Sequence, residues 1–330
     1  MGTAPLAVSV GDPAGIGAEV IAKSWLQRTE QALPPFFAVG DAGAFERVWD
    51  GPVEIISDPN QAVAVFPSAL PVIHVADSTV PPGSVDLVGA RNAFDALELA
   101  VGLTRSGAAS GLVTGPVSKA RLYSVGFVHP GQTEFIAERC GVSRELIAMM
   151  LAGPSLRVVP VTTHIPLKDA PDALSIDAIV NKGRAAIRGL QRQFGIEQPR
   201  VAVAGLNPHA GEQGQLGREE IEVIAPAIER LRDEGYDVTG PYAPDVMFHQ
   251  ARRQHYDLAL CMYHDQALIP LKTLHFEEGI NMTLGLPIVR SSPDHGTAFD
   301  IAGQDRADPR AMIAAIRTAG DCVRRLAAAG

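Results

Sequence analysis

Residues 201–235 read VAVAGLNPHAGEQGQLGREEIEVIAPAIERLRDEG, where a short apolar run precedes a glycine-rich loop and an amphipathic segment. The apolar run is typical of a buried strand, because its apolar residues follow one another without interruption. Residues 219–235 carry apolar side chains at helical spacing, which predicts a helix. The loop between them, residues 205–217, is too rich in glycine for a helix and too long for a tight turn. Loops of this size in compact domains are usually functional.

The same order of strand and helix recurs along the chain. Apolar runs are followed by helix-like stretches at 5–11 and 17–27, at 36–41 and 42–50, and at 111–116 and 118–126. Residues 311–329 predict a terminal helix. Repeated alternation of strand and helix is typical of an α/β fold, with mostly parallel sheets and helices on both faces.

Length and composition exclude several classes of protein. The chain has 330 residues, enough for two domains or one large one, and 46% of them are hydrophobic. Its net charge of −9 argues against a nucleic-acid-binding surface, which requires a basic face. We find neither a signal-peptide pattern nor an apolar run of the ~20 residues that span a bilayer, so we expect a cytoplasmic protein without a membrane partner. The widely spaced cysteines fit a reducing compartment and are interpreted as small buried hydrophobic residues: Cys140, Cys261 and Cys322.

Three histidines each follow a short apolar run within a few residues. The runs are VVPVTTH, VAVAGLNPH and LALCMYH, and they end at His164, His209 and His264. Strand ends of an open α/β sheet converge on one crevice, where ligands bind. Three imidazoles in that crevice would form a divalent-metal site with positions left open for substrate. The alternative is three unrelated histidines in loops, because this spacing carries no motif of its own.

Three further motifs combine glycine with polar residues. GDPAGIG at 11–17 is neither the GxGxxG fingerprint nor a P-loop, and a ligand contact or a plain strand-to-helix turn would explain its glycines equally well. In TGPVSK at 114–119 the hydroxyl and N–H groups suit an anion, whereas Ser118 as a helix cap is the alternative. PGQTE at 130–134 places Gln132 and Thr133 at a helix start, where they suit a phosphate or carboxylate, although capping also explains the threonine.

Two segments near the C-terminus add candidate ligand-binding residues. Lys272 and Arg290 are cations within otherwise apolar segments of the sequence. This favours a pocket that binds an anion, whereas a lysine is usually exposed to solvent. DHGTAFDIAG at 294–303 is a compact cluster of polar residues and glycine, as found in loops that contact small molecules. His295 would contact an adenine ring, or it is satisfied by the local backbone.

These motifs occur in order along essentially the whole chain: GDPAGIG, TGPVSK, PGQTEFIAE, TTHIPLKD, AGLNPHAGE, MYHDQALIPLK and NMTLGLPIVRSSPDHGTAFDIAG. In this combination the chain resembles the 4-hydroxythreonine-4-phosphate dehydrogenase family of vitamin B6 biosynthesis, which is distantly similar to isopropylmalate and isocitrate dehydrogenases. The resemblance implies a two-domain, isopropylmalate dehydrogenase-like α/β fold with mostly parallel sheets and a central cleft. Residues 1–128 and 276–330 would form a discontinuous nucleotide-binding domain, and 129–275 the central metal, substrate and dimerisation domain.

The resemblance also implies roles for individual residues. The metal ligands would be His164, His209 and His264, one of them reaching across an obligate homodimer from the neighbouring subunit. A small anionic substrate would be bound by Gln132, Thr133, Lys272, Asn281 and Arg290. NAD or NADP would be bound by Asp12, Gly15, His295, Gly296, Thr297 and Ala298. The metal would be Zn²⁺, Mg²⁺ or Co²⁺.

The implied reaction is metal-dependent oxidation of 4-phosphooxy-L-threonine by NAD(P)+ to 2-amino-3-oxo-4-phosphooxybutanoate, followed by decarboxylation to 3-amino-2-oxopropyl phosphate. Asp265 and Asp245 are the candidates for the catalytic base. Gln132 departs from the family, which commonly has histidine at this position. The substrate of a related enzyme is therefore an alternative for this chain. The alternatives are a 4-phosphorylated sugar acid, namely threonate or erythronate phosphate, and a cis-dihydrodiol dicarboxylate. A non-catalytic metal- or nucleotide-binding protein is the alternative of a different class.

Overall fold

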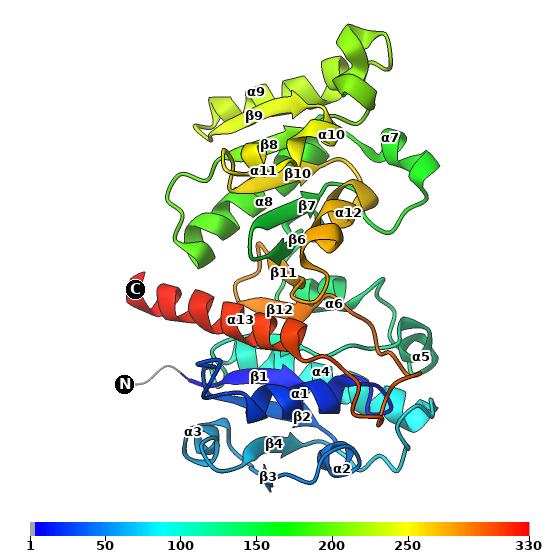
Figure 1. Ribbon diagram of the computed structural model, residues 1–330, viewed down its shortest axis with the longest axis vertical. Coiled ribbons are helices and arrows are strands. Elements are labelled where there is room, and N and C mark those ends of the chain that lie inside the picture. Colours follow the sequence, from blue (N-terminus) through cyan, green and yellow to red (C-terminus); the bar gives the residue numbers. More distant parts are fainter. Residues whose placement is uncertain (1–3, 330) are drawn as a thin grey trace. The chain divides into compact units, whose positions relative to one another are not determined.

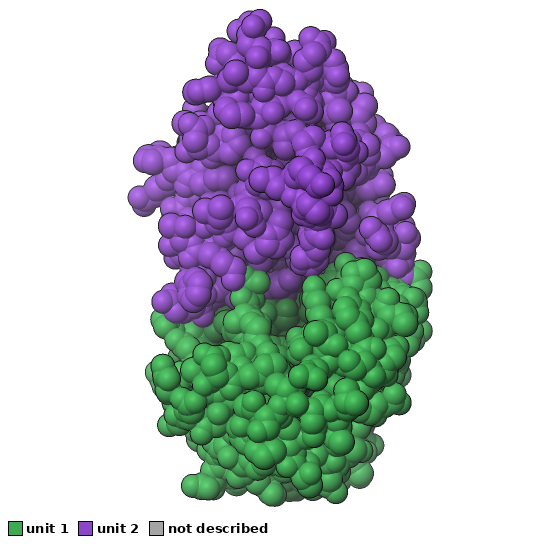
Figure 2. Space-filling model, turned by 90° about the vertical axis from the view of Figure 1, so that its right-hand side faces the viewer, with its two compact units in different colours: residues 1–141, 287–330 green, residues 142–286 purple. Residues whose placement is uncertain are grey.

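The structure is a computed structural model that describes residues 4–329. The chain divides into two compact units, which are coloured separately in Figure 2. The first unit runs as far as Gly141 and resumes at Pro287, and the second comprises Val142–Leu286. The first unit is therefore discontinuous in sequence.

The observed boundaries differ from the expected ones, which followed residues 128 and 275. Residues 129–141 lie in the first unit because Phe135 packs against Phe94 and Phe127, with ring centroids 5.7 and 5.5 Å away. Residues 276–286 lie in the second unit because their strand pairs with the one at Ala148–Gly153. Aromatic packing therefore accounts for the first difference in boundary, and strand pairing accounts for the second.

The first unit contains a parallel sheet with the strand order β3-β4-β2-β1-β5-β12. Its strands are β1 (Leu6–Ser9), β2 (Phe36–Gly40), β3 (Val53–Ile55), β4 (Leu70–His74), β5 (Leu112–Thr114) and β12 (Arg290–Pro293). Helix α4 covers one face, and α13 with α1 covers the other (Figure 1). The helices are α1 (Gly17–Leu26), α2 (Ala42–Glu46), α3 (Ala62–Val65), α4 (Leu87–Arg105), α5 (Lys119–Ser124), α6 (Gln132–Arg139) and α13 (Arg310–Ala329).

The second unit contains strands in the order β11-β6-β7-β10-β8-β9. They are β6 (Ala148–Gly153), β7 (Leu156–Pro160), β8 (Val201–Ala204), β9 (Val238–Tyr242), β10 (Leu258–Cys261) and β11 (Ile280–Leu284). Strand β6 is antiparallel to both of its neighbours, and the pairings from β7 to β9 are parallel. Helices α8 and α9 pack together, and α12 packs on β7 and β6 (Figure 1). The helices are α7 (Ala170–Ala173), α8 (Ile176–Phe194), α9 (Ala225–Asp233), α10 (Pro244–Met247), α11 (Gln250–Arg253) and α12 (His264–His275).

The predicted α/β class with mostly parallel strands is confirmed. Strands β1, β2 and β10 are buried along their whole length, as expected for strands of a parallel sheet covered on both faces. The helix expected at 219–235 forms, and its first turn is a π-helical turn, Glu220–Ile224, that continues into α9. Pro226 has no N–H group, so a regular α-helical bond cannot form there. Within residues 4–329 we find no helix whose length and apolar character would let it cross a bilayer.

Two helical glycines provide a test of the packing in the two units. A Cβ on Gly189 of α8 would lie 2.8 Å from the Leu284 Cβ of β11, whereas a Cβ on Gly102 of α4 would meet no heavy atom within 4 Å. We expect Gly189→Ala to lower the free energy of unfolding by about 1–3 kcal/mol through overpacking. The matched Gly102→Ala change should raise it by about 0.4–1 kcal/mol, because alanine restricts the unfolded chain. Urea unfolding measures both values, and equal stability of the two variants would contradict the tight contact between α8 and β11.

Candidate active site

Two of the predicted metal-binding histidines, His164 and His264, line the same cavity. They follow the neighbouring parallel strands β7 and β10, and their ring centroids lie 5.7 Å apart. The cavity has a volume of about 220 Å³ and is lined by Thr162, Thr163, His164, Ile165, Leu167, Ala170, Tyr263, His264 and Asp265. Its lining thus includes Asp265, whose Oδ1 lies 2.7 Å from the Nδ1 of His264. A carboxylate in this position orients an imidazole and leaves Nε2 for a ligand.

The backbone around this cavity is held by two polar side chains that the sequence analysis did not single out. Thr162 donates from its backbone N–H and from Oγ1 to the carbonyl of Met262, at 3.2 and 2.9 Å. The Oε1 of Gln266 accepts from the N–H of Met262 at 2.7 Å, and its Nε2 donates to the carbonyl of Gly205 at 2.8 Å. Gln266 therefore links the end of β10 to the end of β8. The signal available in the sequence was a polar residue two positions before His164 and another two positions after His264.

The third histidine, His209, lies in a loop of unusual conformation and does not line that cavity. The φ angles of the five residues from His209 to Gln213 are 54°, 50°, 78°, 42° and 56°, so the whole run is left-handed. His164 is also left-handed, with φ of 47°. This conformation costs roughly 1–2 kcal/mol for each residue with a Cβ, and such strain gathers at functional sites.

Three other predicted site residues of the second unit do not line the cavity that contains His164 and His264. Asp245 is exposed on the short helix α10, which packs against the segment containing His209. The Nζ of Lys272 lies 5.6 Å from the ring centroid of Phe276. The Oδ1 of Asn281, on β11, is buried and has no hydrogen-bond partner among the described residues. An acceptor in this state can receive a hydrogen bond from a ligand.

The first unit brings together three of the predicted substrate-binding residues. Arg290 is buried at the start of β12 and donates to the Thr114 Oγ1 of β5 at 2.7 Å. Its guanidinium also lies 3.5 Å from the Thr133 Oγ1 and 3.5 Å from the Gln132 Oε1 of α6. The amide nitrogen of Gln132 donates to the carbonyl of Gly115 at 3.1 Å, so its oxygen faces the guanidinium. Burial lowers the pKa of Arg290 to about 10, which still leaves a cation at neutral pH.

The two segments predicted to bind the nucleotide lie against each other. The N–H of Ile16 donates to the carbonyl of Thr297 at 3.0 Å. A Cβ on Gly15 would lie 2.9 Å from the same oxygen, so only glycine allows this approach. Ala298 follows with a left-handed φ of 42°. The sequence motifs GDPAGIG and DHGTA therefore form one surface.

Two ionisable residues of that surface have distinct environments. The Nδ1 of His295 lies 3.0 Å from the carbonyl of Gly296, and its buried Nε2 has no partner among the described residues. With Nδ1 donating, Nε2 is an acceptor suited to an amino or hydroxyl group. The Oδ1 of Asp12 accepts from the N–H of Ala14 at 3.1 Å, and burial raises the pKa of this carboxyl group.

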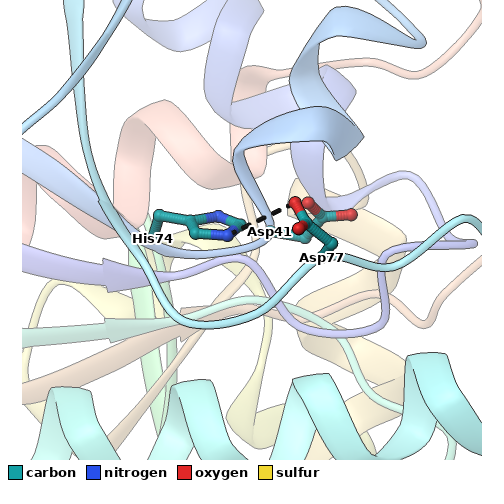
Figure 3. A group of neighbouring side chains, drawn as sticks. All are labelled: Asp41, His74 and Asp77. Carbon is teal, nitrogen blue, oxygen red and sulfur yellow. Dashed lines mark ion pairs between the residues drawn. The ribbon is translucent and has the colours of Figure 1, made fainter.

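A further group with metal-ligand chemistry lies at the carboxyl ends of β2 and β4, where Asp41, His74 and Asp77 gather (Figure 3). The Nδ1 of His74 accepts from the N–H of Ala42 at 3.2 Å, so Nε2 carries the proton and faces Asp77 at 3.4 Å. Asp41 accepts from the N–H of Gly43 and from Arg47 at 2.9 and 2.7 Å. Because these hydrogen bonds use the ligand atoms, the group fits a structural role better than a metal site.

Known proteins match this chain over nearly its whole length. The family model described as pyridoxal phosphate biosynthetic protein PdxA matches residues 32–319. A 4-hydroxythreonine-4-phosphate dehydrogenase from Zymomonas mobilis subsp. mobilis is 53% identical, over 94% of this chain and 93% of its own. The crystal structure of 4-hydroxythreonine-4-phosphate dehydrogenase from Klebsiella pneumoniae is 37% identical with a TM-score of 0.86, covering 97% of this chain and 99% of its own. A terephthalate 1,2-cis-dihydrodioldehydrogenase from Burkholderia xenovorans LB400 is 30% identical with a TM-score of 0.65, over 96% and 98% of the two chains. As its ordered motifs indicate, the chain belongs to the PdxA family, that of the 4-hydroxythreonine-4-phosphate dehydrogenases.

Proposed function

We propose that this oxidoreductase oxidises 4-phosphooxy-L-threonine with NAD+ or NADP+ in a metal-dependent reaction of vitamin B6 biosynthesis. The product, 2-amino-3-oxo-4-phosphooxybutanoate, would then lose CO2 to give 3-amino-2-oxopropyl phosphate. The observation that carries the proposal is the buried guanidinium of Arg290, surrounded by the polar side chains of Thr114, Gln132 and Thr133. A buried guanidinium suits an anionic ligand such as a phosphate.

The residues of the second unit fit a divalent cation, for which we propose Zn²⁺, Mg²⁺ or Co²⁺. His164 and His264 share a cavity, and Asp265 holds the imidazole of His264 with Nε2 available. His209 would be the third ligand. When bound, the cation supplies Lewis-acid chemistry, which lowers the pKa of a hydroxyl group and stabilises negative charge on a carbonyl oxygen.

The chain's own residues would bind and orient the reactants. Arg290 and Thr133 would hold the phosphate group of the substrate, and Lys272 and Asn281 would bind its other polar groups. Because Asp265 is engaged with His264, we assign it an orienting role and propose Asp245 as the base. The nicotinamide cofactor would bind at the surface formed by the segments that contain Gly15 and Thr297, joined by Asp12, His295, Gly296 and Ala298.

Gln132 supports a second candidate substrate class. Its amide is neutral and is engaged with Gly115 and Arg290, so it adds no charge for a phosphate. A carboxylate needs less positive charge, and one relative is named terephthalate 1,2-cis-dihydrodioldehydrogenase. A cis-dihydrodiol dicarboxylate is therefore the alternative that Gln132 favours, and threonate or erythronate phosphate is the phosphorylated alternative. Initial rates of NAD+ and NADP+ reduction with each compound separate these candidates.

The metal proposal is tested by removing one ligand. We expect His209→Ala to reduce metal-dependent NAD(P)+ reduction by more than about 100-fold, since even residues that only orient a metal ligand contribute about 10–100-fold. His255→Ala removes another exposed histidine of the same unit and should leave the rate unchanged. Wild-type-like turnover of His209→Ala after exhaustive chelation would contradict a catalytic metal.

We also propose that the enzyme is a homodimer in which one histidine of each metal site comes from the partner. Alanine variants of His164, His209 and His264 should then complement one another when mixed in pairs and refolded. If one ligand crosses the interface, two of the three pairings recover about a quarter of the sites, because half of the dimers are mixed and each has one intact site. The failing pair identifies the two histidines from one chain, and failure of every pairing would contradict a shared site.

The buried cation gives a prediction about stability and binding together. Arg290→Met should abolish binding of inorganic phosphate in titration calorimetry. At neutral pH the variant should unfold at the same or a higher urea concentration than the wild type, because it removes a buried charge.

Folding lowers the pKa of Arg290, so above a pH of about 10 the unfolded chain binds more protons than the folded protein, and the free energy of unfolding of the wild type rises with pH. The advantage of the variant should therefore shrink above that pH. Arg105→Met, exposed on α4, is the control, and retained phosphate binding by Arg290→Met would contradict the proposed pocket.

A further inference from the structure

We propose that Glu220 is a positioning residue for His209. Its buried carboxylate would hold the left-handed loop in the conformation that presents the imidazole, so that metal affinity depends on a side chain outside the ligand set. The inference rests on the proposed function, because it takes His209 to be a metal ligand. Glu220 is only 4% exposed and belongs to the π-helical turn before α9.

The carboxylate of Glu220 receives hydrogen bonds from the start of the histidine loop. Its Oε1 accepts from the backbone N–H groups of Leu206 and Asn207 at 2.8 and 2.7 Å. Its Oε2 accepts from the side-chain amide of Asn207 at 3.0 Å, and that amide also donates to Glu219 at 2.7 Å. Three donors from Leu206 and Asn207, which stand three and two residues before His209, thus converge on one carboxylate.

Glycines in the same loop leave room for this contact. A Cβ on Gly211 would lie 2.6 Å from the Glu220 Oε2, and a Cβ on Gly205 would lie 3.1 Å from its Oε1. A Cβ on Gly217 would lie 2.3 Å from the Asn207 amide. Gly211 also stands in the left-handed run, with φ of 78°. The loop therefore approaches the Glu220 carboxylate closely both before and after His209 in the sequence.

The same loop is connected to the rest of the candidate metal site. Gly205, which packs against Glu220, accepts from the Gln266 amide, and Gln266 also accepts from the N–H of Met262. Met262 stands two residues before His264. A continuous set of hydrogen bonds and packing contacts thus joins the Glu220 carboxylate to the segment that carries His264.

Glutamine would not replace this carboxylate. A carboxylate only accepts hydrogen bonds, whereas a primary amide has one accepting oxygen and two N–H donors. In Glu220→Gln the amide nitrogen would face the donors that Oε1 or Oε2 now satisfies. The isosteric change therefore removes the bonds to one of the two oxygens without changing the volume, and it should loosen the left-handed run.

The experiment uses full-length protein and Co²⁺ as the probe, titrated calorimetrically into metal-free enzyme well below its melting temperature. We expect Glu220→Gln to weaken Co²⁺ binding by about 10–100-fold, as for other residues that orient metal ligands. Amide hydrogen exchange should become faster within residues 205–217, because the strained loop opens more often. Asn207→Ala removes only the side-chain bonds and should act in the same direction with a smaller effect.

Glu222→Gln is the matched control, since Glu222 is exposed and pairs with Arg218 on the same turn. It should change neither Co²⁺ affinity nor loop exchange, and NAD+ affinity should be unchanged in every variant. If His209→Ala loses Co²⁺ while Glu220→Gln and Asn207→Ala bind it like wild type, the inference is overturned and the metal proposal stands. If His209→Ala binds Co²⁺ like wild type, the metal proposal fails and this inference fails with it.

Discussion

The candidate metal site depends on one constraint, that buried polar groups at the ends of β7, β8 and β10 must find hydrogen-bond partners. Gln266 meets it with one amide, which accepts from the N–H of Met262 and donates to the carbonyl of Gly205. Thr162 meets it by donating twice to the carbonyl of Met262. These bonds fix the positions from which the histidine loops leave the sheet, before any ligand contributes.

The loop of His209 shows how the chain tolerates an unfavourable backbone at such a position. Five consecutive left-handed residues would not persist in a free segment. The Glu220 carboxylate, the Asn207 amide and the closely packed glycines around them supply interactions that only this conformation makes. Strain held in this way keeps an imidazole exposed on a rigid loop, which suits a residue that must meet a ligand without rearranging.

In the first unit, the corresponding features are a buried cation and the close approach of two backbone segments. Arg290 is kept by hydroxyl and amide oxygens from two other elements, β5 and α6. Glycine at position 15 lets the GDPAGIG segment reach the backbone of Thr297. The sequence predicted all of these segments as ligand-binding candidates, but it gave no means of pairing Thr114 with Arg290, because 175 residues separate them in the chain.

Alternating apolar runs and ordered motifs are local patterns, so the sequence was enough to predict the α/β class, the mostly parallel strands and the family. It also placed His164 and His264 at strand ends, where a parallel sheet must bring them together. The unit boundaries required the folded structure, because they depend on aromatic packing around Phe135 and on the pairing of β11 with β6. It alone also revealed Gln266 and Glu220, because a buried polar side chain is defined by the distant backbone groups that it satisfies.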